Sequence, residues 1–198
     1  MPKPPVDHFG FLSPLYERFI RPADPAQLLA LLQLAPGQTL LDVGGGTGRI
    51  TQALVGAGVT LTLLDPSVGM LRQAQGKRCC FPCLGLAEAL PFASGSFSRV
   101  LAVDSFHHFW DYDRAAAELL RVLAPEGRLV IEEPDVRKFW VKLVALAERL
   151  ALMRSQFHPP AALAARFHAA GGAVELHHLP DNPNYWAVIT HSRTLIAS

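Results

Sequence analysis

The sequence predicts a single α/β domain built on a doubly wound, mostly parallel β-sheet. Short apolar segments that suit strands alternate with amphipathic segments that suit helices. Right-handed crossovers turn such an alternation into a sheet with helices on both faces. A run of glycines follows the first predicted strand, at the edge where sheets of this kind bind ligands. With 198 residues, the chain has the length of one domain with one sizeable core.

The composition disfavours several classes of function. Half of the residues are hydrophobic, the formal net charge is +1, and Lys and Arg are scattered along the chain. This pattern predicts a folded domain without a nucleic-acid partner. No apolar run is long enough to span a bilayer, and the first ten residues lack the apolar core of a secretion signal. We therefore expect a cytoplasmic protein that does not insert into membranes.

The three cysteines do not predict a disulfide framework or a metal site. Cys79, Cys80 and Cys83 form an odd, crowded set, unlike the paired cysteines of secreted scaffolds. The spacing of Cys80 and Cys83 occurs in zinc sites, but no second pair or nearby histidine completes one. Ordinary thiols on a strand are the expectation, with no bound metal.

Residues 1–23 form an aromatic segment that precedes the predicted sheet. Phe9, Phe11, Tyr16 and Phe19 would expose too much apolar surface in a free tail. We expect the segment to fold over the ligand crevice as a lid. The alternative is a helix packed on the core.

The first predicted elements surround the glycines. Asp24 and Pro25 are typical of a helix start, and the helix is expected to run to residue 34. A strand at residues 40–43 follows, then the glycines, then a helix from residue 49 that Gly56 ends. The next strand, residues 59–64, is almost continuously apolar, as in a parallel sheet covered on both faces.

The middle of the chain continues the alternation. A helix is predicted at residues 68–75, short strands at 81–84 and 100–103, and a loop at 86–92 between them. Asp113 is expected to begin the next helix, with Pro125 and Gly127 after its end. A fifth strand is predicted at residues 128–132.

A helical region is predicted at residues 135–172, before a closing hairpin. Its first helix, at 139–153, is apolar around most of its circumference. It could line a substrate pocket or meet a second copy in a homodimer, but packing on the sheet is favoured. A second helix follows Pro160, and strands at 174–179 and 186–191 form an antiparallel hairpin that completes the sheet. With no linker or repeat, residues 1–198 are predicted to form one domain.

The glycines after residue 43 predict a nucleotide-type binding turn. Gly44, Gly46 and Gly48 have the spacing G-x-G-x-G, and Arg49 occupies the place of the third glycine of the dinucleotide pattern. Backbone N–H groups at such a turn face a ligand, because no Cβ blocks its approach. Asp42 lies where a carboxylate would repel a pyrophosphate and attract an ammonium group. A dinucleotide is therefore disfavoured.

Asp65 is the next candidate ligand. It ends the second strand about twenty residues beyond the glycine turn, where a carboxylate can accept hydrogen bonds from both hydroxyls of a ribose. The alternative is an N-cap of the following helix. Residues 44–48, Asp65, 86–88 and 104–108 all follow strands, so they converge on one edge of the predicted sheet.

The segments LLDVGGGTGRI, LLDPSVGML, GLAEALPF, SFHHF and LLRVLAPEGRLVIEEP carry a resemblance to a known family. Over roughly residues 6–135, the chain resembles the class I S-adenosylmethionine (SAM)-dependent methyltransferases, with the ubiquinone/menaquinone-biosynthesis (methyltransferase type 11) branch as the nearest. The resemblance implies a Rossmann-like sheet of seven strands whose last strand is antiparallel. It also implies SAM as the cofactor.

The same resemblance implies which residues would contact SAM. Gly44–Gly46 would line its methionine part with Asp42 supporting that loop, Asp65 would hold its ribose, and Tyr16 would cover it. The other implied contacts lie beside the adenine or the methionine end. The implied cofactor-binding residues are Tyr16, Asp42, Gly44, Gly45, Gly46, Asp65, Pro66, Ser67, Met70, Ala87, Glu88, Asp104, Ser105 and His108. The family usually has an Asp at the position of Leu86, so adenine recognition here would rest on backbone groups or Glu88.

The expected reaction is O- or C-methylation of a small apolar or aromatic acceptor. Aromatic residues in the lid and at Phe106, Phe109 and Trp110 favour such an acceptor. The Asn/Asp-Pro-Pro-aromatic tetrapeptide of enzymes that methylate amino groups of bases or glutamine is absent after residue 103. A base is needed only if the acceptor loses a proton. The candidates are His107, His108, Tyr16, Asp111 and Glu132.

Two other functions stay open at the level of sequence. A SAM-binding sensor or subunit without catalysis is compatible with Leu86. A nicotinamide-dependent oxidoreductase would use a similar sheet, but Arg49 at the third-glycine position argues against it.

Overall fold

The computed structural model of the protein describes residues 24–56, 58–77, 80–138, 141, 156–180 and 182–192. The predicted lid at residues 1–23, including Tyr16, lies outside the described residues. Cys79 also lies outside them, as does the helix predicted at 139–153 except for Val141.

A seven-stranded sheet forms the centre of the protein, in the order β3-β2-β1-β4-β5-β7-β6. Strand β7 is antiparallel to both of its neighbours, and the pairs among β1 to β5 are parallel. The predicted doubly wound sheet with an antiparallel last strand is therefore confirmed. The strands are β1 (Thr39–Val43), β2 (Thr60–Asp65), β3 (Phe81–Leu84), β4 (Phe97–Val103), β5 (Leu123–Pro134), β6 (Gly172–His178) and β7 (Asn184–His191).

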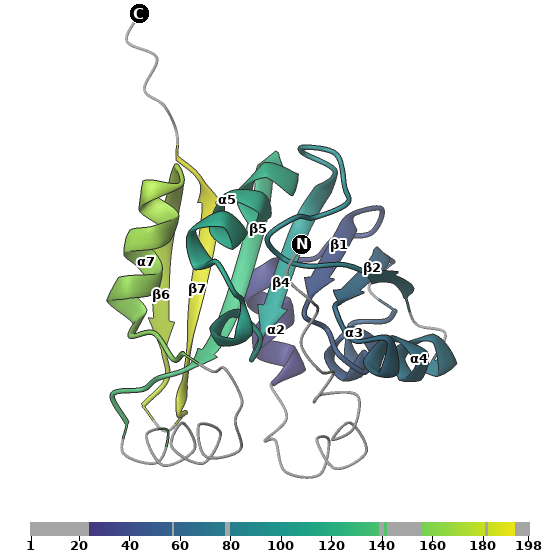
Figure 1. Cartoon of the computed structure of the whole chain (residues 1–198), viewed down its shortest axis with the longest axis horizontal. Helices are drawn as coiled ribbons and strands as arrows, with labels where there is room; N and C mark the ends of the chain where they lie inside the picture. The colour runs from purple at the N-terminus through teal and green to yellow at the C-terminus, as the bar shows by residue number, and fades with distance from the viewer. Residues whose placement is uncertain are drawn as a thin grey trace, which may run out of the picture.

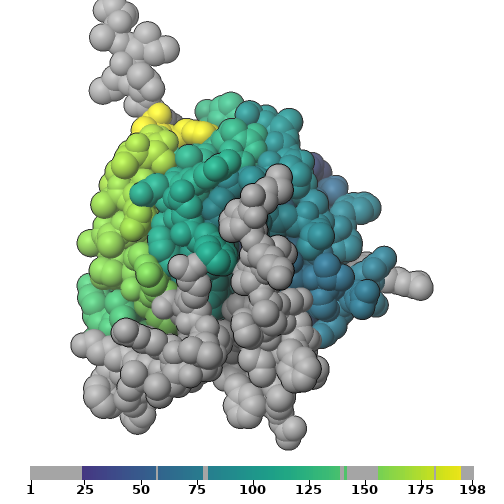
Figure 2. Space-filling view, in the orientation of Figure 1, coloured from purple at the N-terminus to yellow at the C-terminus, as the bar shows by residue number. Residues whose placement is uncertain are grey.

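Helices cover both faces of this sheet. Helices α5 and α7 lie over one face and α2 over the other (Figure 1). In the space-filling view, the colour of this face runs from green at α7 through teal at α5 to blue on the side of α4 (Figure 2). The described helices are α2 (Pro25–Leu32), α3 (Arg49–Ala53), α4 (Val68–Lys77), α5 (Tyr112–Val122), α7 (Pro160–Ala169) and the 3-10 turn η1 (Phe106–His108).

Two apolar clusters, one on each face, hold the helices to the sheet. Helix α2 contributes Leu28 and Leu32 to one cluster, which also contains Trp186 of β7. The other cluster joins α5 and α7 to the opposite sheet face and includes Phe106 and Phe167. Burial of this apolar surface is the main force that fixes the helices on the strands. In the described part of the chain, no helix has the length and apolar character needed to cross a membrane.

The predicted start of α5 was two residues too late. Asp111, not Asp113, is the N-cap, because its carboxylate accepts a hydrogen bond from the Arg114 N–H at 3.0 Å. Both acids are plausible caps in the sequence. The structure places Asp113 in the first turn instead.

Strand β5 begins at Leu123, directly after α5, and not at residue 128 as predicted. Leu123 pairs with Phe97 of β4 and Arg128 pairs with Arg99, so the register shifts between the two pairs. The extra residues of β5 bulge out of the ladder. Pro125 and Gly127, expected to lie between helix and strand, therefore belong to an irregular strand start.

Candidate functional site

The glycine turn between β1 and α3 is tied to both neighbouring strands. The N–H groups of Gly44 and Gly45 donate to the Leu64 carbonyl of β2, at 2.7 and 3.3 Å. Ser105, after β4, donates its hydroxyl to the Val43 carbonyl at 2.9 Å. Gly44 has φ +72°, and a Cβ there would lie 2.5 Å from the Ser105 Cβ. Only glycine fits between the ends of these strands.

Asp65 holds the turn from the end of β2. Its Oδ2 accepts a hydrogen bond from the Gly46 N–H at 2.9 Å, and its Oδ1 accepts one from the Ser67 N–H at 2.8 Å. Ser67 in turn accepts a bond from the Met70 N–H at the start of α4. Asp65 thus stabilises the turn that precedes α4. This role resembles the alternative named above, in which Asp65 caps the following helix. Its contact with a ribose stays a prediction.

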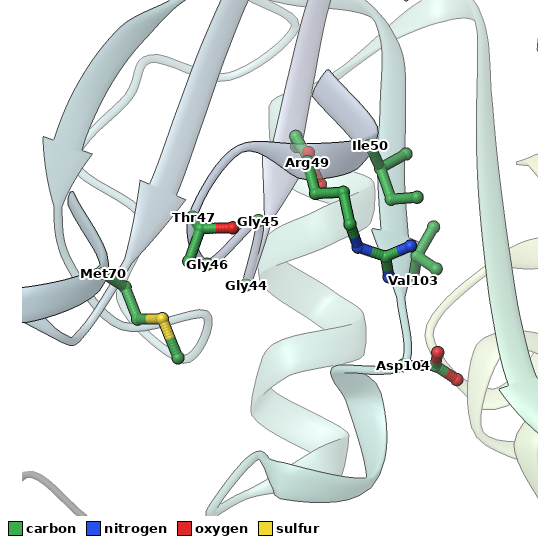
Figure 3. A pocket seen from close by; sticks show the side chains of 10 residues that line it. Gly44, Gly45, Gly46, Thr47, Arg49, Ile50, Met70, Val103 and Asp104 are labelled. Atoms are coloured by element: carbon green, nitrogen blue, oxygen red, sulfur yellow. The ribbon is translucent and has the colours of Figure 1, made fainter. Parts of the chain in front are cut away.

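The glycine turn and the ends of β1 and β4 enclose a cavity. Figure 3 shows Met70 on one side of the turn, and Arg49, Val103 and Asp104 on the other. The cavity is lined by Asp42, Gly44, Gly45, Gly46, Thr47, Arg49, Ile50, Met70, Val103 and Asp104. Six of these are predicted cofactor residues: Asp42, Gly44, Gly45, Gly46, Met70 and Asp104. They come from three separate segments of the sequence.

Asp42 lies beneath the turn and is almost fully buried. Its Oδ2 accepts a hydrogen bond from the Thr51 hydroxyl of α3. Burial raises the pKa of Asp42 to about 6, the Thr51 bond opposes this rise, and the charge of Asp65 adds to it. Asp42 therefore links β1 to α3 and also faces the cavity.

Asp104 follows β4 in an unusual backbone conformation, with φ +49°. Burial raises the pKa of its carboxyl to about 7, and the nearby Glu133 and Glu132 add to the rise, while His107 and Arg49 oppose it. Among the described residues, none forms a hydrogen bond with this carboxylate. A strained, cavity-lining acid that titrates near neutral pH is typical of a functional site.

Arg49 enters the cavity from the first residue of α3. Side chains at a helix start point back toward its N-terminus, and Figure 3 shows the Arg49 side chain extending toward Val103 and Asp104. In the sequence, Arg49 counted only against a dinucleotide ligand, and its place in the cavity lining was not predicted. Its position directly after the last glycine was the available signal. Thr47, Ile50 and Val103 were also missed.

The two candidate histidines do not belong to this lining. His107 is 3% exposed, and its Nδ1 lies 2.6 Å from Oε2 of Glu133. Its ring stacks on Phe157, with centroids 4.3 Å apart. Burial and the neighbouring His107 lower the pKa of His108 well below its usual value. His108 is therefore neutral at pH 7, and the role of either ring as a base stays a prediction.

Two other predicted residues, Glu88 and Glu132, have structural partners. Oε1 of Glu88 accepts hydrogen bonds from the N–H groups of Trp110 and Asp111, at 2.6 and 3.4 Å. Glu132 accepts bonds from Trp186 Nε1 and Asn184 Nδ2, at 3.0 and 2.7 Å. Glu88 therefore fixes the loop before α5, and Glu132 joins β5 to β7.

The remaining predicted residues within the described ranges are absent from the lining of this cavity. Ala87 is buried, Leu86 is 49% exposed, and Ser105 and Ser67 hold the walls through the bonds described above. Pro66 lies between Asp65 and Ser67. Cys80 and Cys83 are half-buried, and neither forms a disulfide with another described residue. Within the described ranges, no group of three or more His, Cys, Asp or Glu side chains could hold a metal ion.

This lining suits a ligand with opposite charges at one end. Two carboxylates and one guanidinium line the same cavity as the backbone of residues 44–46. Among the described residues, a Cβ at Gly46 would meet only Met70 Sδ, at 3.9 Å, so no described side chain crowds the backbone of the turn there. A pyrophosphate would meet Asp42 and Asp104, and these carboxylates would repel it.

Comparison with known proteins points to one family. Residues 41–131 match the family described as "Methyltransferase domain". The chain is 39% identical over 99 residues to a demethylmenaquinone methyltransferase of Renibacterium salmoninarum, which covers 50% of this chain and 42% of that protein. It is 36% identical over 140 residues to an uncharacterized methyltransferase of Mycobacterium tuberculosis, covering 68% of this chain and 56% of the relative. The chain thus spans about half the length of the curated relatives it matches.

Solved structures share the fold over nearly the whole chain. A Thermotoga maritima protein described as a SAM-dependent methyltransferase, possible histamine N-methyltransferase, superposes with a TM-score of 0.78 at 22% identity, covering 93% of this chain and 98% of that one. A chain from the structure described as the complex between the Haloferax volcanii Trm112 methyltransferase activator and the putative methyltransferase gives a TM-score of 0.79 at 18% identity, covering 94% of this chain and 98% of that one. At these identities the likeness concerns the fold.

Proposed function

Because residues 41–131 carry a methyltransferase domain within a sheet of the methyltransferase fold, we propose that this chain uses SAM to methylate a small apolar or aromatic acceptor. The observation that carries the proposal is the shared cavity of the glycine turn, Asp42 and Asp104 at the ends of β1 and β4. The site supplies exposed backbone, carboxylates for a cationic ligand and a neighbouring acid for a ribose.

The residues present fit SAM in charge and shape. When bound, SAM supplies an electrophilic methyl group on a positively charged sulfur. Asp42 and Asp104 offset positive charge, and residues 44–46 allow close approach of the ligand. The Asp65 carboxylate lies beside the turn through its bonds to Gly46 and Ser67, and a carboxylate is an acceptor suited to ribose hydroxyls.

An aromatic acceptor is favoured by the surroundings of Gly44. The Phe109 ring lies 3.8 Å from the position a Gly44 Cβ would take, so an aromatic side chain borders the turn. Several relatives are named demethylmenaquinone methyltransferase, which favours a quinol-type acceptor among aromatic molecules. Holding such a ring in line with the methyl group is the main catalytic contribution expected of the protein.

Calorimetry with SAM, S-adenosylhomocysteine and NAD tests the cofactor. We expect binding of the first two and none of NAD; binding of NAD alone would refute the proposal. Labelled SAM incubated with quinols and phenols then tests the reaction.

Leu86, in place of the family's acid, supports a second candidate, a SAM-binding sensor or subunit. Binding of SAM without methylation of any quinol or phenol would favour that candidate.

A further inference from the structure

Two charged side chains of α5, Glu118 and Arg121, hold the loop between β3 and β4. Arg121 donates hydrogen bonds to the carbonyls of Leu90 and Phe92, through Nη2 and Nη1, at 3.0 and 2.9 Å. The Leu90 N–H donates to Oε2 of Glu118 at 2.8 Å. The backbone of the loop is therefore bonded at two positions to one helix. The proposed function does not account for this arrangement.

The two side chains are also bonded to each other. The Nε and Nη2 atoms of Arg121 donate to Oε1 and Oε2 of Glu118, at 2.6 and 2.9 Å. Such a bidentate pair has a fixed relative orientation. Both side chains are partly exposed, and an ion pair of this kind adds little stability by itself. Its main consequence is therefore the position of the loop that it holds.

The first part of this loop lies at the edge of the sheet that carries the glycine turn. The Gly85 N–H donates to the carbonyl of Asp65 at 3.3 Å, and the Asp65 side chain holds the turn. Three residues after Gly85, Oε1 of Glu88 accepts the N–H of Trp110, which follows η1. Residues 86–88 are therefore held between the end of β2 and the segment after β4.

The order of the strands indicates where the base of the proposed ligand would lie. Strand β2 lies between β1 and β3, so a ligand that extends from the glycine turn past Asp65 next meets the loop after β3. The base is attached to the ribose that Asp65 is proposed to contact, and it would therefore contact residues 86–88. The Leu86 side chain has no polar group, so polar recognition at that position depends on the loop backbone.

We propose that Glu118 and Arg121 are positioning residues, which hold the loop after β3 in the conformation that recognises the base of the adenosyl ligand and do not touch the ligand themselves. This inference rests on the proposed function. A loop that is ordered before binding adds affinity, because less conformational freedom is lost when the ligand binds. The two residues would therefore raise the affinity for adenosyl compounds over compounds that lack the base.

Two thioethers separate recognition of the base from recognition of the rest of the ligand. S-adenosylhomocysteine carries the base. S-ribosylhomocysteine keeps the amino acid, the sulfur and the ribose, and lacks the base. Neither has a sulfonium, so the charge on sulfur is constant. Affinities are measured by calorimetry for the wild type, Arg121→Met and Arg121→Lys.

The expected loss of affinity is confined to the compound with the base. The wild type should bind S-adenosylhomocysteine at least about tenfold more tightly than S-ribosylhomocysteine. Arg121→Met removes every side-chain donor to the loop. It should weaken S-adenosylhomocysteine by about fivefold to tenfold and leave S-ribosylhomocysteine within about twofold. Arg121→Lys keeps the charge and can donate to one carbonyl, so it should recover part of the affinity.

Arg114→Met is the matched control for Arg121→Met. Arg114 also lies on α5, and its charge helps to lower the pKa of Glu118. Within the described part of the chain, its backbone N–H bonds to Asp111, and its side chain donates no hydrogen bond to the loop. Neither affinity should change in this variant. A change equal to that of Arg121→Met would mean that charge, and not the bonds to the loop, is responsible.

Glu118→Gln tests the same inference with a smaller change. It keeps an acceptor for the Leu90 N–H and loses the charged pair with Arg121, so it should show the same selective loss, by about threefold. Thermal melting of each variant verifies that it is folded. If Arg121→Met is unfolded at the temperature of the titration, Glu118→Gln and Arg121→Lys provide the comparison.

Equal weakening of both thioethers by Arg121→Met would show a general role in folding and would overturn the inference. Unchanged binding of S-adenosylhomocysteine in that variant would overturn it too. Equal affinities of the two thioethers for the wild type would mean that the base is not recognised, and the inference would fail while the proposed function stands. If the wild type binds neither SAM nor S-adenosylhomocysteine, the proposed function fails instead.

Discussion

The Oδ2 atom of Asp65 lies 2.9 Å from the backbone nitrogen of Gly46 and accepts its hydrogen bond. This bond joins the end of β2 to the turn that follows β1. Because the same carboxylate also accepts from Ser67, one side chain fixes both the glycine turn and the start of α4. The conformation of the glycine turn therefore depends in part on this acid.

Asp65→Asn is expected to weaken both the fold and the binding of SAM. The amide replaces one oxygen acceptor by a donor, which leaves one buried backbone N–H without its partner. The free energy of unfolding should fall by about 1–3 kcal/mol in urea denaturation. The affinity for SAM should fall by about tenfold or more in calorimetry.

Asp24→Asn is the control for this substitution. Asp24 also accepts a backbone N–H, that of Ala26, but at the exposed start of α2. Asn caps a helix about as well as Asp, so stability and SAM binding should both stay close to wild type. Unchanged SAM binding in Asp65→Asn would remove Asp65 from the site.

Gly46→Ala and Gly37→Ala should separate binding from stability. Gly46 and Gly37 have φ +56° and +84°, and a Cβ meets Met70 Sδ at 3.9 Å in the first and nothing within 4 Å in the second. Both variants carry the strain of a positive φ, about 1–2 kcal/mol. Only the Gly46 methyl would occupy the cavity, so only Gly46→Ala should lose SAM binding in calorimetry. Equal binding by both variants would place the ligand elsewhere.

The ionised carboxylate of Asp104 should lower the free energy of unfolding at neutral pH. Its pKa is about 7 in the folded protein, above the usual value of an unfolded Asp, so between roughly pH 4 and pH 7 the folded state holds a proton that the unfolded state has released. Stability therefore falls as the pH rises through this window and is constant above it. Asp104→Asn removes this cost.

The expected gain from Asp104→Asn at pH 8 is about 1–3 kcal/mol in the free energy of unfolding. This gain should disappear near pH 4, where Asp104 is neutral in both states. Denaturation at the two pH values provides the measurement. An equal effect at both would show that the charge of Asp104 carries no such cost.

Local sequence was sufficient for most of the fold. The predicted strand at 81–84 coincides with β3, and the helix after Pro160 coincides with α7. Alternating apolar segments and turn residues define such elements without help from the rest of the chain. The start of β5 was missed because Leu123 is extended by its pairing with Phe97, a contact between strands that a local pattern does not contain.

In the candidate site too, local features were predicted and contacts between distant residues were not. The glycine turn and Asp65 were predicted because their spacing along the chain sets their chemistry. The partner of His107 was missed, because Glu133 is 26 residues away and meets it only through the register of β4 and β5. Glu88 was expected beside an adenine, but its bond to Trp110 depends on how two loops pack. Side chains that contact each other across strands require the three-dimensional arrangement.

Glu133 should fix both the orientation of the His107 ring and the ring nitrogen that carries its proton. Oε1 of Glu133 accepts the Phe106 N–H at 2.8 Å, while Oε2 meets His107 Nδ1. Glu133→Leu leaves both buried groups without a partner and should cost about 3 kcal/mol of unfolding free energy or more. Glu133→Gln keeps an acceptor for Phe106 and should cost less, about 1 kcal/mol.

The Gln variant should also move the proton on the His107 ring. Its amide donates to Nδ1, so the ring proton is expected on Nε2, and nitrogen NMR of the imidazole distinguishes the two forms. SAM affinity should be unchanged, because His107 is absent from the cavity lining within the described ranges. A ring that keeps its proton on Nδ1 in this variant would contradict the positioning role of Glu133.

Leu86→Asp should strengthen SAM binding if the adenine lies beside the loop after β3. Leu86 is 49% exposed, so an acid there should not disrupt the core. A carboxylate that accepts a hydrogen bond from the adenine amino group should raise the affinity by about threefold to tenfold. Leu179→Asp, at a comparably exposed leucine of the β6–β7 hairpin, should have no effect on SAM affinity.

The gain in affinity should also vanish with S-inosylhomocysteine. This compound lacks the amino group that S-adenosylhomocysteine presents, so the carboxylate then has no donor. An equal gain for both compounds would mean that the new charge acts at long range and that the adenine is not recognised at this loop.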